Sequence, residues 1–165
     1  MTLEKFTIKA QEAVQEAVNT AQRAGQQSIE PVHILYGIIS KGKDVSNFIF
    51  QKLGVNAAQI ENLVNNEIQH LPRIQGGGQP YLSNESNNVL LKSQDIAKSM
   101  GDEFVSVEPI MQALLAVNST ASRILKDAGM TEKDMQAAIN ELRQGQKVQS
   151  QSADDNYQSL SKYAK

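Results

Sequence analysis

The chain has 165 residues, of which 40% are hydrophobic, and it contains no cysteine. This length allows one compact core or two small cores in contact. The lack of cysteine excludes a disulfide framework and a thiolate metal site, and it favours the reducing cytoplasm as the location. Sixteen basic and eighteen acidic residues are interspersed, which argues against binding to nucleic acid or anionic lipid. No apolar run approaches the roughly 18 residues of a membrane span, so we expect a soluble protein.

The first predicted element is a helix between Thr7 and Ala24. Small apolar residues recur there every three or four positions, which is the helical period, and Gly25 follows as a stop signal. The phrase SIEPVHIL at residues 28–35 then opens a second apolar run, led by a proline that suits a first helical turn. This run is too hydrophobic to lie on a surface. Further helical sequence, FIFQKLGVNAAQIENLV, follows it.

The second half of the chain repeats this order. The residues Val89 to Met100 have helical spacing and end at Gly101, and SVEPIMQA at 106–113 echoes the earlier phrase 78 residues later. The segment RILKDAGMTEKDMQAAI then aligns with the FIFQKLG segment and pairs Gly54 with Gly129. The sequence therefore predicts an all-α fold of about eight helices, built by duplication of a unit of roughly 65 residues.

Composition sets the expected boundaries. Repeat one spans about residues 6–68, a connector containing three consecutive glycines spans 69–80, and repeat two spans about 81–142. The domain is expected to cover residues 1–144, and the polar, Gln- and Ser-rich residues 145–165 are expected to form a flexible linker. Helical spacing returns at Tyr157, Leu160 and Tyr163, as if a new element began there.

Two short motifs resemble chemical sites. GIISKGKD at residues 37–44 falls one residue short of a phosphate-binding loop, because Asp44 stands where a Ser or Thr must reach magnesium, and its surroundings are helical. Glu30 and His33 have the Glu-x-x-His spacing of di-iron bundles, but the second unit has Met111 in place of His33. We interpret His33 as a structural residue and the motif at 37–44 as a helix end with Gly42 in the turn. No nucleophile and base can be paired, which favours a protein that is not an enzyme.

Glu30 and Glu108 each precede a proline at a predicted helix start. A carboxylate there faces the positive end of the helix dipole and free amides, so both are candidate caps, with Ser28 and Ser106 as rival caps.

The duplicated unit, the opening FTIKAQEAVQEA, the phrase SIEPVHIL and the segment GDEFVSVEPI together resemble the N-terminal domain of Clp-type AAA+ unfoldases, most closely the ClpB-type disaggregases. The resemblance implies a pseudo-twofold, monomeric domain, mobile on its linker above a hexameric ATPase ring. It would bind exposed apolar segments of unfolded or aggregated polypeptides and deliver them to the ring. It implies no cofactor in this segment. ATP, magnesium and an Hsp70-type co-chaperone would act through other domains.

Four residues are candidates for substrate contact. The resemblance assigns substrate handling to three polar positions, Thr7, Asp102 and Glu108, of which the first two are expected to reach solvent near helix ends. The helical period adds Leu91, which lies roughly 150° from the buried face of its helix and so points to solvent. An exposed leucine is ordinary by itself, but it can belong to a patch that binds apolar chains.

Three function classes remain at this point: a module that binds unfolded polypeptide, a small enzyme that uses Glu30 and His33, and a scaffold that docks folded partners. The lack of a catalytic constellation disfavours the enzyme. Only the resemblance separates the other two, because helical repeats with shallow grooves serve both. The alternative function is therefore an adaptor-docking domain of a protease-associated Clp unfoldase.

Overall fold

The computed structural model describes residues 3–153, which form eight α-helices and one two-stranded sheet. The helices are α1 (Ile8–Arg23), α2 (Pro31–Lys41), α3 (Lys43–Lys52), α4 (Ala57–His70), α5 (Asn84–Ser99), α6 (Val107–Ala116), α7 (Thr120–Asp127) and α8 (Glu132–Arg143), and the strands are β1 (Ser28–Ile29) and β2 (Tyr81–Leu82). The predicted all-α duplicated fold is confirmed. The predicted helical spacing at 157–163 lies outside the described residues. Between residues 3 and 153, no helix combines the length and hydrophobicity that crossing a membrane requires.

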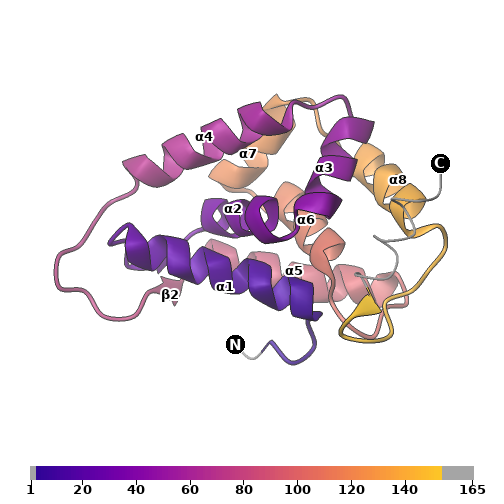
Figure 1. Ribbon diagram of the computed structural model, residues 1–165, viewed down its shortest axis with the longest axis horizontal. Helices are drawn as coiled ribbons and strands as arrows, with labels where there is room; N and C mark the ends of the chain where they lie inside the picture. Colours follow the sequence, from indigo (N-terminus) through magenta and orange to yellow (C-terminus); the bar gives the residue numbers. More distant parts are fainter. Residues whose placement is uncertain (1–2, 154–165) are drawn as a thin grey trace.

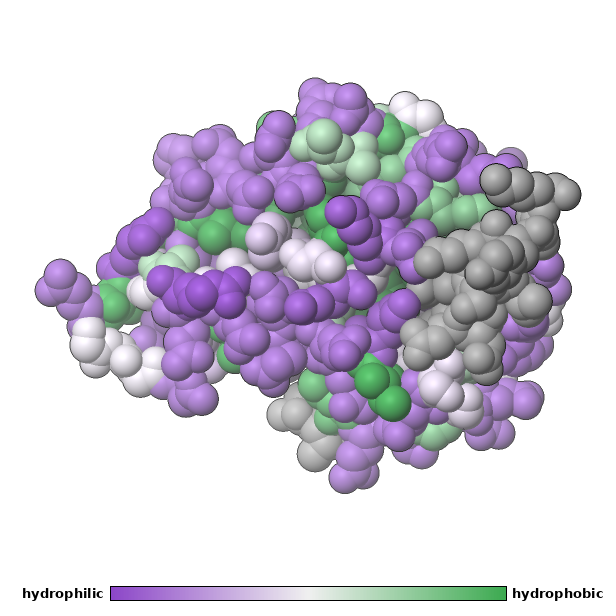
Figure 2. Space-filling view, in the orientation of Figure 1, coloured by the Kyte–Doolittle hydropathy of each residue, from purple (hydrophilic) through white to green (hydrophobic). Residues whose placement is uncertain are grey.

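The helices α2 and α6 occupy the middle of the molecule. Figure 1 shows α1 and α5 on one side of them, α4 and α7 on the other, and α3 and α8 at one end. Both central helices are buried on nearly every side, as expected of helices that lack a polar face. The outer helices bury a single apolar stripe, and most of the face in Figure 2 is hydrophilic.

The two repeats pair with each other where each one begins. Thr7 and Ser83, 76 residues apart, are the N-caps of α1 and α5. The residue before each cap joins a parallel bridge to the other repeat: Phe6 pairs with Val105, and Leu82 pairs with Ile29. This exchange joins the lobes through backbone hydrogen bonds as well as through the core.

The repeated Ser-x-Glu-Pro phrase does not occupy equivalent positions. Glu30 is the N-cap of α2, whereas in the second unit Ser106 is the N-cap and Glu108 lies inside the first turn of α6. The N-caps are 76 residues apart, while the phrase recurs after 78. Pro109 fits the first turn because the amides there have no partner within the helix. Glu30 is therefore at the predicted cap position, and the expectation that Glu108 caps its helix is wrong.

Residues 145–153 pack on the domain, although the sequence places the start of a flexible linker at 145. Val148 is completely buried, and its carbonyl accepts from the amide of Glu103 at 2.8 Å. The amide of Ile8 donates to the carbonyl of Gln151 at 2.8 Å. One apolar anchor thus holds an otherwise polar segment in place.

Candidate functional site

The side chains of Thr7 and Asp102 are buried, so the prediction that they reach solvent is wrong. Thr7 caps α1, because its Oγ1 accepts from the amide of Ala10 at 3.1 Å, but its exposed fraction is 0%. Its own amide donates to the carbonyl of Val105 at 2.9 Å, which draws the N-terminal segment over the side chain. The Asp102 side chain is also fully enclosed. Neither group can line an open rim.

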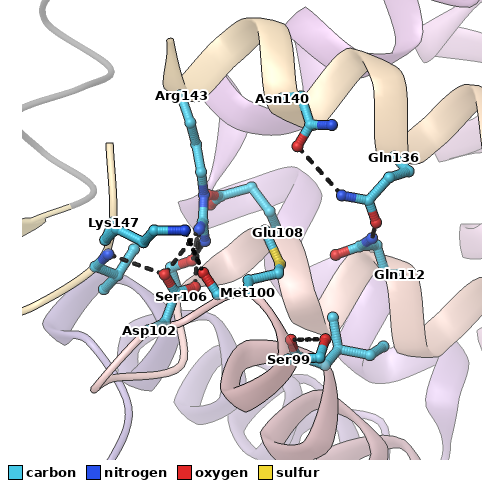
Figure 3. Close-up of polar contacts among 12 residues, drawn as sticks. Ser99, Met100, Asp102, Ser106, Glu108, Gln112, Gln136, Asn140, Arg143 and Lys147 are labelled. Atoms are coloured by element: carbon cyan, nitrogen blue, oxygen red, sulfur yellow. Dashed lines mark hydrogen bonds and ion pairs between the residues drawn. The ribbon is translucent and has the colours of Figure 1, made fainter. Parts of the chain in front are cut away.

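Arg143, at the end of α8, joins two of the predicted polar residues. Its Nη1 lies 2.8 Å from Asp102 Oδ2, and its Nε donates to Glu108 Oε1 at 3.0 Å. Its Nη2 donates to Ser106 Oγ at 2.8 Å, and that hydroxyl donates in turn to Glu108 at 3.2 Å. Figure 3 shows this cluster at the junction of α8 and the loop before α6. The guanidinium is the buried counterion that lets both carboxylates stay inside the protein.

The Glu-x-x-His motif has a structural role, because a hydrogen bond joins its two residues at the start of α2. His33 is buried, its Nδ1 accepts from the amide of Glu30 at 2.8 Å, and its Nε2 lies 2.7 Å from Gln26 Oε1. Because Nδ1 accepts, Nε2 carries the proton and donates to Gln26. Burial lowers the pKa of His33 from 6.5 to about 4. Among residues 3–153 no group of three or more His, Asp or Glu side chains is placed to hold a metal ion.

A groove runs between α5 and α8, beside the Arg143 cluster. It consists of two adjoining cavities of about 340 Å³ and 210 Å³, which share Ser99 and Gln136. Ile96, which is partly exposed, and the completely buried Leu115 and Met135 are the apolar residues around the smaller cavity. The larger one is lined by Met100, Arg143 and residues 145–147, among others. We call this feature the α5–α8 groove.

A row of carboxamides follows the groove (Figure 3). Gln112 Nε2 donates to Gln136 Oε1 at 2.6 Å, and Gln136 Nε2 donates to Asn140 Oδ1 at 3.2 Å. Gln112 Oε1 is buried and has no hydrogen-bond partner among the described residues. Leaving such an acceptor unsatisfied costs about 1–3 kcal/mol. Peptide amides and carbonyls match carboxamides as partners.

Leu91 is 53% exposed, which confirms the prediction that it points to solvent. It does not line the groove, although its neighbour Lys92 does. The residues one turn away on either side, Asn87, Asn88, Gln94 and Asp95, are all polar. Leu91 is therefore an exposed apolar side chain without apolar neighbours one turn away on α5, the helix that forms one wall of the groove.

Two other cavities have different linings. One of about 380 Å³, between the starts of α2 and α7, carries Glu30, Glu67 and Glu85 against Arg123 and is poorly suited to an apolar segment. Another of about 420 Å³ lies between α4 and α7 and includes Leu63, which is 41% exposed.

Neither Arg143 nor the carboxamide row was predicted from the sequence. One signal for Arg143 was present: the alignment that pairs Gly54 with Gly129 places Arg143 opposite Ile68, which is buried. When a charged residue stands at a position that is buried in the other repeat, it is expected to have a buried partner of opposite charge. The carboxamides gave no signal, because polar residues on an outer helix face are usually solvated.

Comparison with known proteins agrees with this architecture. Residues 5–128 match the family model of the Clp repeat (R) N-terminal domain. The chain is 62% identical over 164 residues to the chaperone protein ClpB of Bacteroides thetaiotaomicron and 46% identical to that of Porphyromonas gingivalis, in each case over 99% of this chain and 19% of the relative. It therefore spans about a fifth of those proteins.

Solved structures show the same fold. The Hsp104 N-terminal domain from Candida albicans superposes with a TM-score of 0.80 at 24% identity, covering 92% of this chain and 99% of that one. The N-terminal domain of ClpD from Arabidopsis thaliana gives a TM-score of 0.65 at 21% identity, covering 86% and 97%. With the matching family model and the ClpB relatives, these comparisons show that the chain belongs to the Clp repeat N-terminal domain family, in the form carried by ClpB chaperones.

Proposed function

We propose that this domain binds exposed apolar segments of unfolded or aggregated polypeptides in the α5–α8 groove and, within a longer protein, delivers them to an ATPase ring. The observation that carries the proposal is the carboxamide row of Gln136 and Asn140 beside an apolar floor at Ile96. An extended segment can place side chains on the floor and its backbone against the row. Backbone recognition is independent of sequence, as binding to many unfolded chains requires.

The predicted polar residues take part indirectly in this proposal. Asp102 and Glu108 hold Arg143 at the groove, and Thr7 fastens the N-terminal segment to the loop that carries both Asp102 and Ser106. Their replacement would alter the shape of the groove and the stability of the domain together. Leu91 lies on the adjacent face of α5, outside the groove, and is the alternative contact if the groove does not bind substrate.

The test is a titration of a permanently unfolded model protein, and of its folded form, against the domain. Gln136→Ala removes a hydrogen bond worth about 0.5–1.5 kcal/mol, so affinity should fall between a few-fold and about tenfold. Ile96→Ser removes apolar contact and should weaken binding by a similar factor. Each variant is compared at matched fraction folded.

Two exposed leucines serve as controls. Leu91→Ser changes the same helix outside the groove, and Leu63→Ser changes the α4–α7 cavity. Both should bind substrate nearly as the wild type does. Loss of binding in Leu63→Ser alone would place the site between α4 and α7, and loss in Leu91→Ser alone would favour a surface patch. Equal or stronger binding of the folded form would favour the adaptor-docking function instead.

A further inference from the structure

Residues 145–153 form a strap that crosses from the end of α8 to the N-terminal segment. Its apolar contacts are the completely buried Val148 and the partly buried Ala153, and its other contacts are polar. Lys147 Nζ donates to the carbonyl of Met100 at 2.9 Å, and Gln151 Nε2 donates to the carbonyl of Glu4 at 3.0 Å. The strap therefore has few buried apolar contacts, and elements with few buried contacts open at low free energy.

Asp102 contacts both the strap, at Val148, and Arg143, which lines the groove. Its Oδ1 accepts from the amide of Val148 at 3.0 Å and from Arg143 Nη1 at 3.0 Å. In addition, Gly145, Gln146 and Lys147 line the larger cavity of the groove, together with Arg143. The strap thus supplies part of the groove wall and shares a carboxylate with the residue at its end.

We propose that the strap is a latch that couples the chain beyond residue 153 to the α5–α8 groove. With the strap docked, the groove is complete and binds substrate more tightly. With the strap released, the wall at 145–147 is lost and Asp102 holds Arg143 without its second partner. Coupling is reciprocal, so bound substrate must hold the strap down. Tension on the chain beyond the strap then favours release of substrate. This inference rests on the proposed function of the groove.

The test uses the 165-residue chain with Val148→Asp, which places a charge in the buried anchor position. Gln149→Asp is the matched control, because it adds the same charge at the next residue, which is exposed. Amide hydrogen exchange at Ile8, Glu103 and Val148 reports whether the strap is docked, since their amides bond across it. Val148→Ala serves as a milder variant if Val148→Asp unfolds the domain.

Val148→Asp should accelerate exchange at these amides at least tenfold and weaken binding of the unfolded protein roughly three- to tenfold, while Gln149→Asp changes neither. In the wild type, saturating substrate should slow exchange at the same amides. If exchange accelerates in Val148→Asp but its affinity for the unfolded protein is unchanged, the latch proposal is wrong and the groove proposal is unaffected. Unchanged exchange in Val148→Asp would show that Val148 is not the anchor and would also overturn the latch. If the wild type fails to bind unfolded protein, the groove proposal and the latch proposal are both wrong.

Discussion

In each repeat, a side chain just after the glycine that ends the first helix bonds to the end of the last helix. The two repeats make this contact with different chemical groups. In the first, Gln26 Nε2 donates to the carbonyl of Ile68 and its Oε1 accepts from His33. In the second, Asp102 accepts from the side chain of Arg143. Gln26 and Asp102 are 76 residues apart and each follows a glycine with positive φ. We call the group around Gln26 the neutral centre and the group around Asp102 the charged centre. The contribution of each centre to stability should therefore depend differently on pH and on substitution.

The neutral centre predicts a loss of stability in mild acid. Because burial lowers the pKa of His33 to about 4, the unfolded chain binds its proton near pH 6.5 while the folded chain does not. The stabilisation is complete above pH 6.5 and is lost progressively as the pH falls from 6.5 to about 4. The loss attributable to His33 is at most about 3 kcal/mol. Urea unfolding between pH 7 and pH 4 measures it.

His33→Gln is the control for this prediction. Glutamine at the third helical position accepts from the N-cap amide as His33 does, but it does not titrate. The difference in unfolding free energy between wild type and His33→Gln should therefore narrow as the pH falls. A constant difference would mean that His33 titrates alike in both states.

The charged centre predicts strong destabilisation when its cation is removed. Arg143→Met leaves Asp102 and Glu108 buried without a counterion, which typically costs about 3–5 kcal/mol. Arg23→Met, which removes an exposed guanidinium from its ion pair with Glu16 and its hydrogen bond to Thr20, should cost less than about 1 kcal/mol. Denaturant unfolding at neutral pH compares the two, and adding Glu108→Gln to Arg143→Met should recover part of the loss. Equal costs for the two arginines would contradict the buried cluster.

At the scale of elements, α1 and α2 approach most closely at Gly37. A Cβ atom built there would lie 2.0 Å from the carbonyl oxygen of Ala13, a backbone atom that cannot move alone. Gly37→Ala must therefore push the helices apart, and we expect a loss of about 1–3 kcal/mol or more, as in other overpacked cores. Thermal unfolding measures it. Gly78→Ala, where nothing lies within 4 Å, should leave stability unchanged, and a neutral Gly37→Ala would show that the contact is looser than described.

The junction of α2 and α3 carries the sequence that resembles a phosphate-binding loop. Gly42 joins two helices there, as predicted, whereas a phosphate-binding loop follows a strand. We therefore expect no heat of binding when magnesium and ATP are titrated into the domain by calorimetry. Micromolar binding that Lys43→Ala abolishes would contradict this expectation.

At the scale of the molecule, the two lobes share one continuous cluster of buried residues. Val14 in the first repeat and Leu90 in the second both belong to it. Either residue replaced by Asp buries an unpaired charge at a cost of several kcal/mol, and both lobes should unfold together. Amide exchange or NMR signals from each repeat report the two lobes separately, and Gln15→Asp, on the exposed face of α1, should have little effect. Two separate transitions would show that the lobes are independent.

The sequence alone determined the helices, their stops and the duplication. The helical period and the glycine stops are local properties, and a repeat is visible in any chain that carries it, so Gly25 and Gly101 could be identified without a structure. Leu91 could be placed on an exposed face for the same reason.

Tertiary structure alone decided the surroundings of the polar residues. Arg143 meets Glu108 and Asp102 across 35 and 41 residues of chain, and neither spacing is encoded in a local period. Thr7 could be placed near the end of a helix, but it is completely buried, and its backbone hydrogen bond to Val105 forms only through the exchange between repeats. The composition of residues 145–153 predicts a linker, but Val148 anchors them to the domain. One buried side chain and a few backbone hydrogen bonds can hold a polar segment that lacks a core of its own.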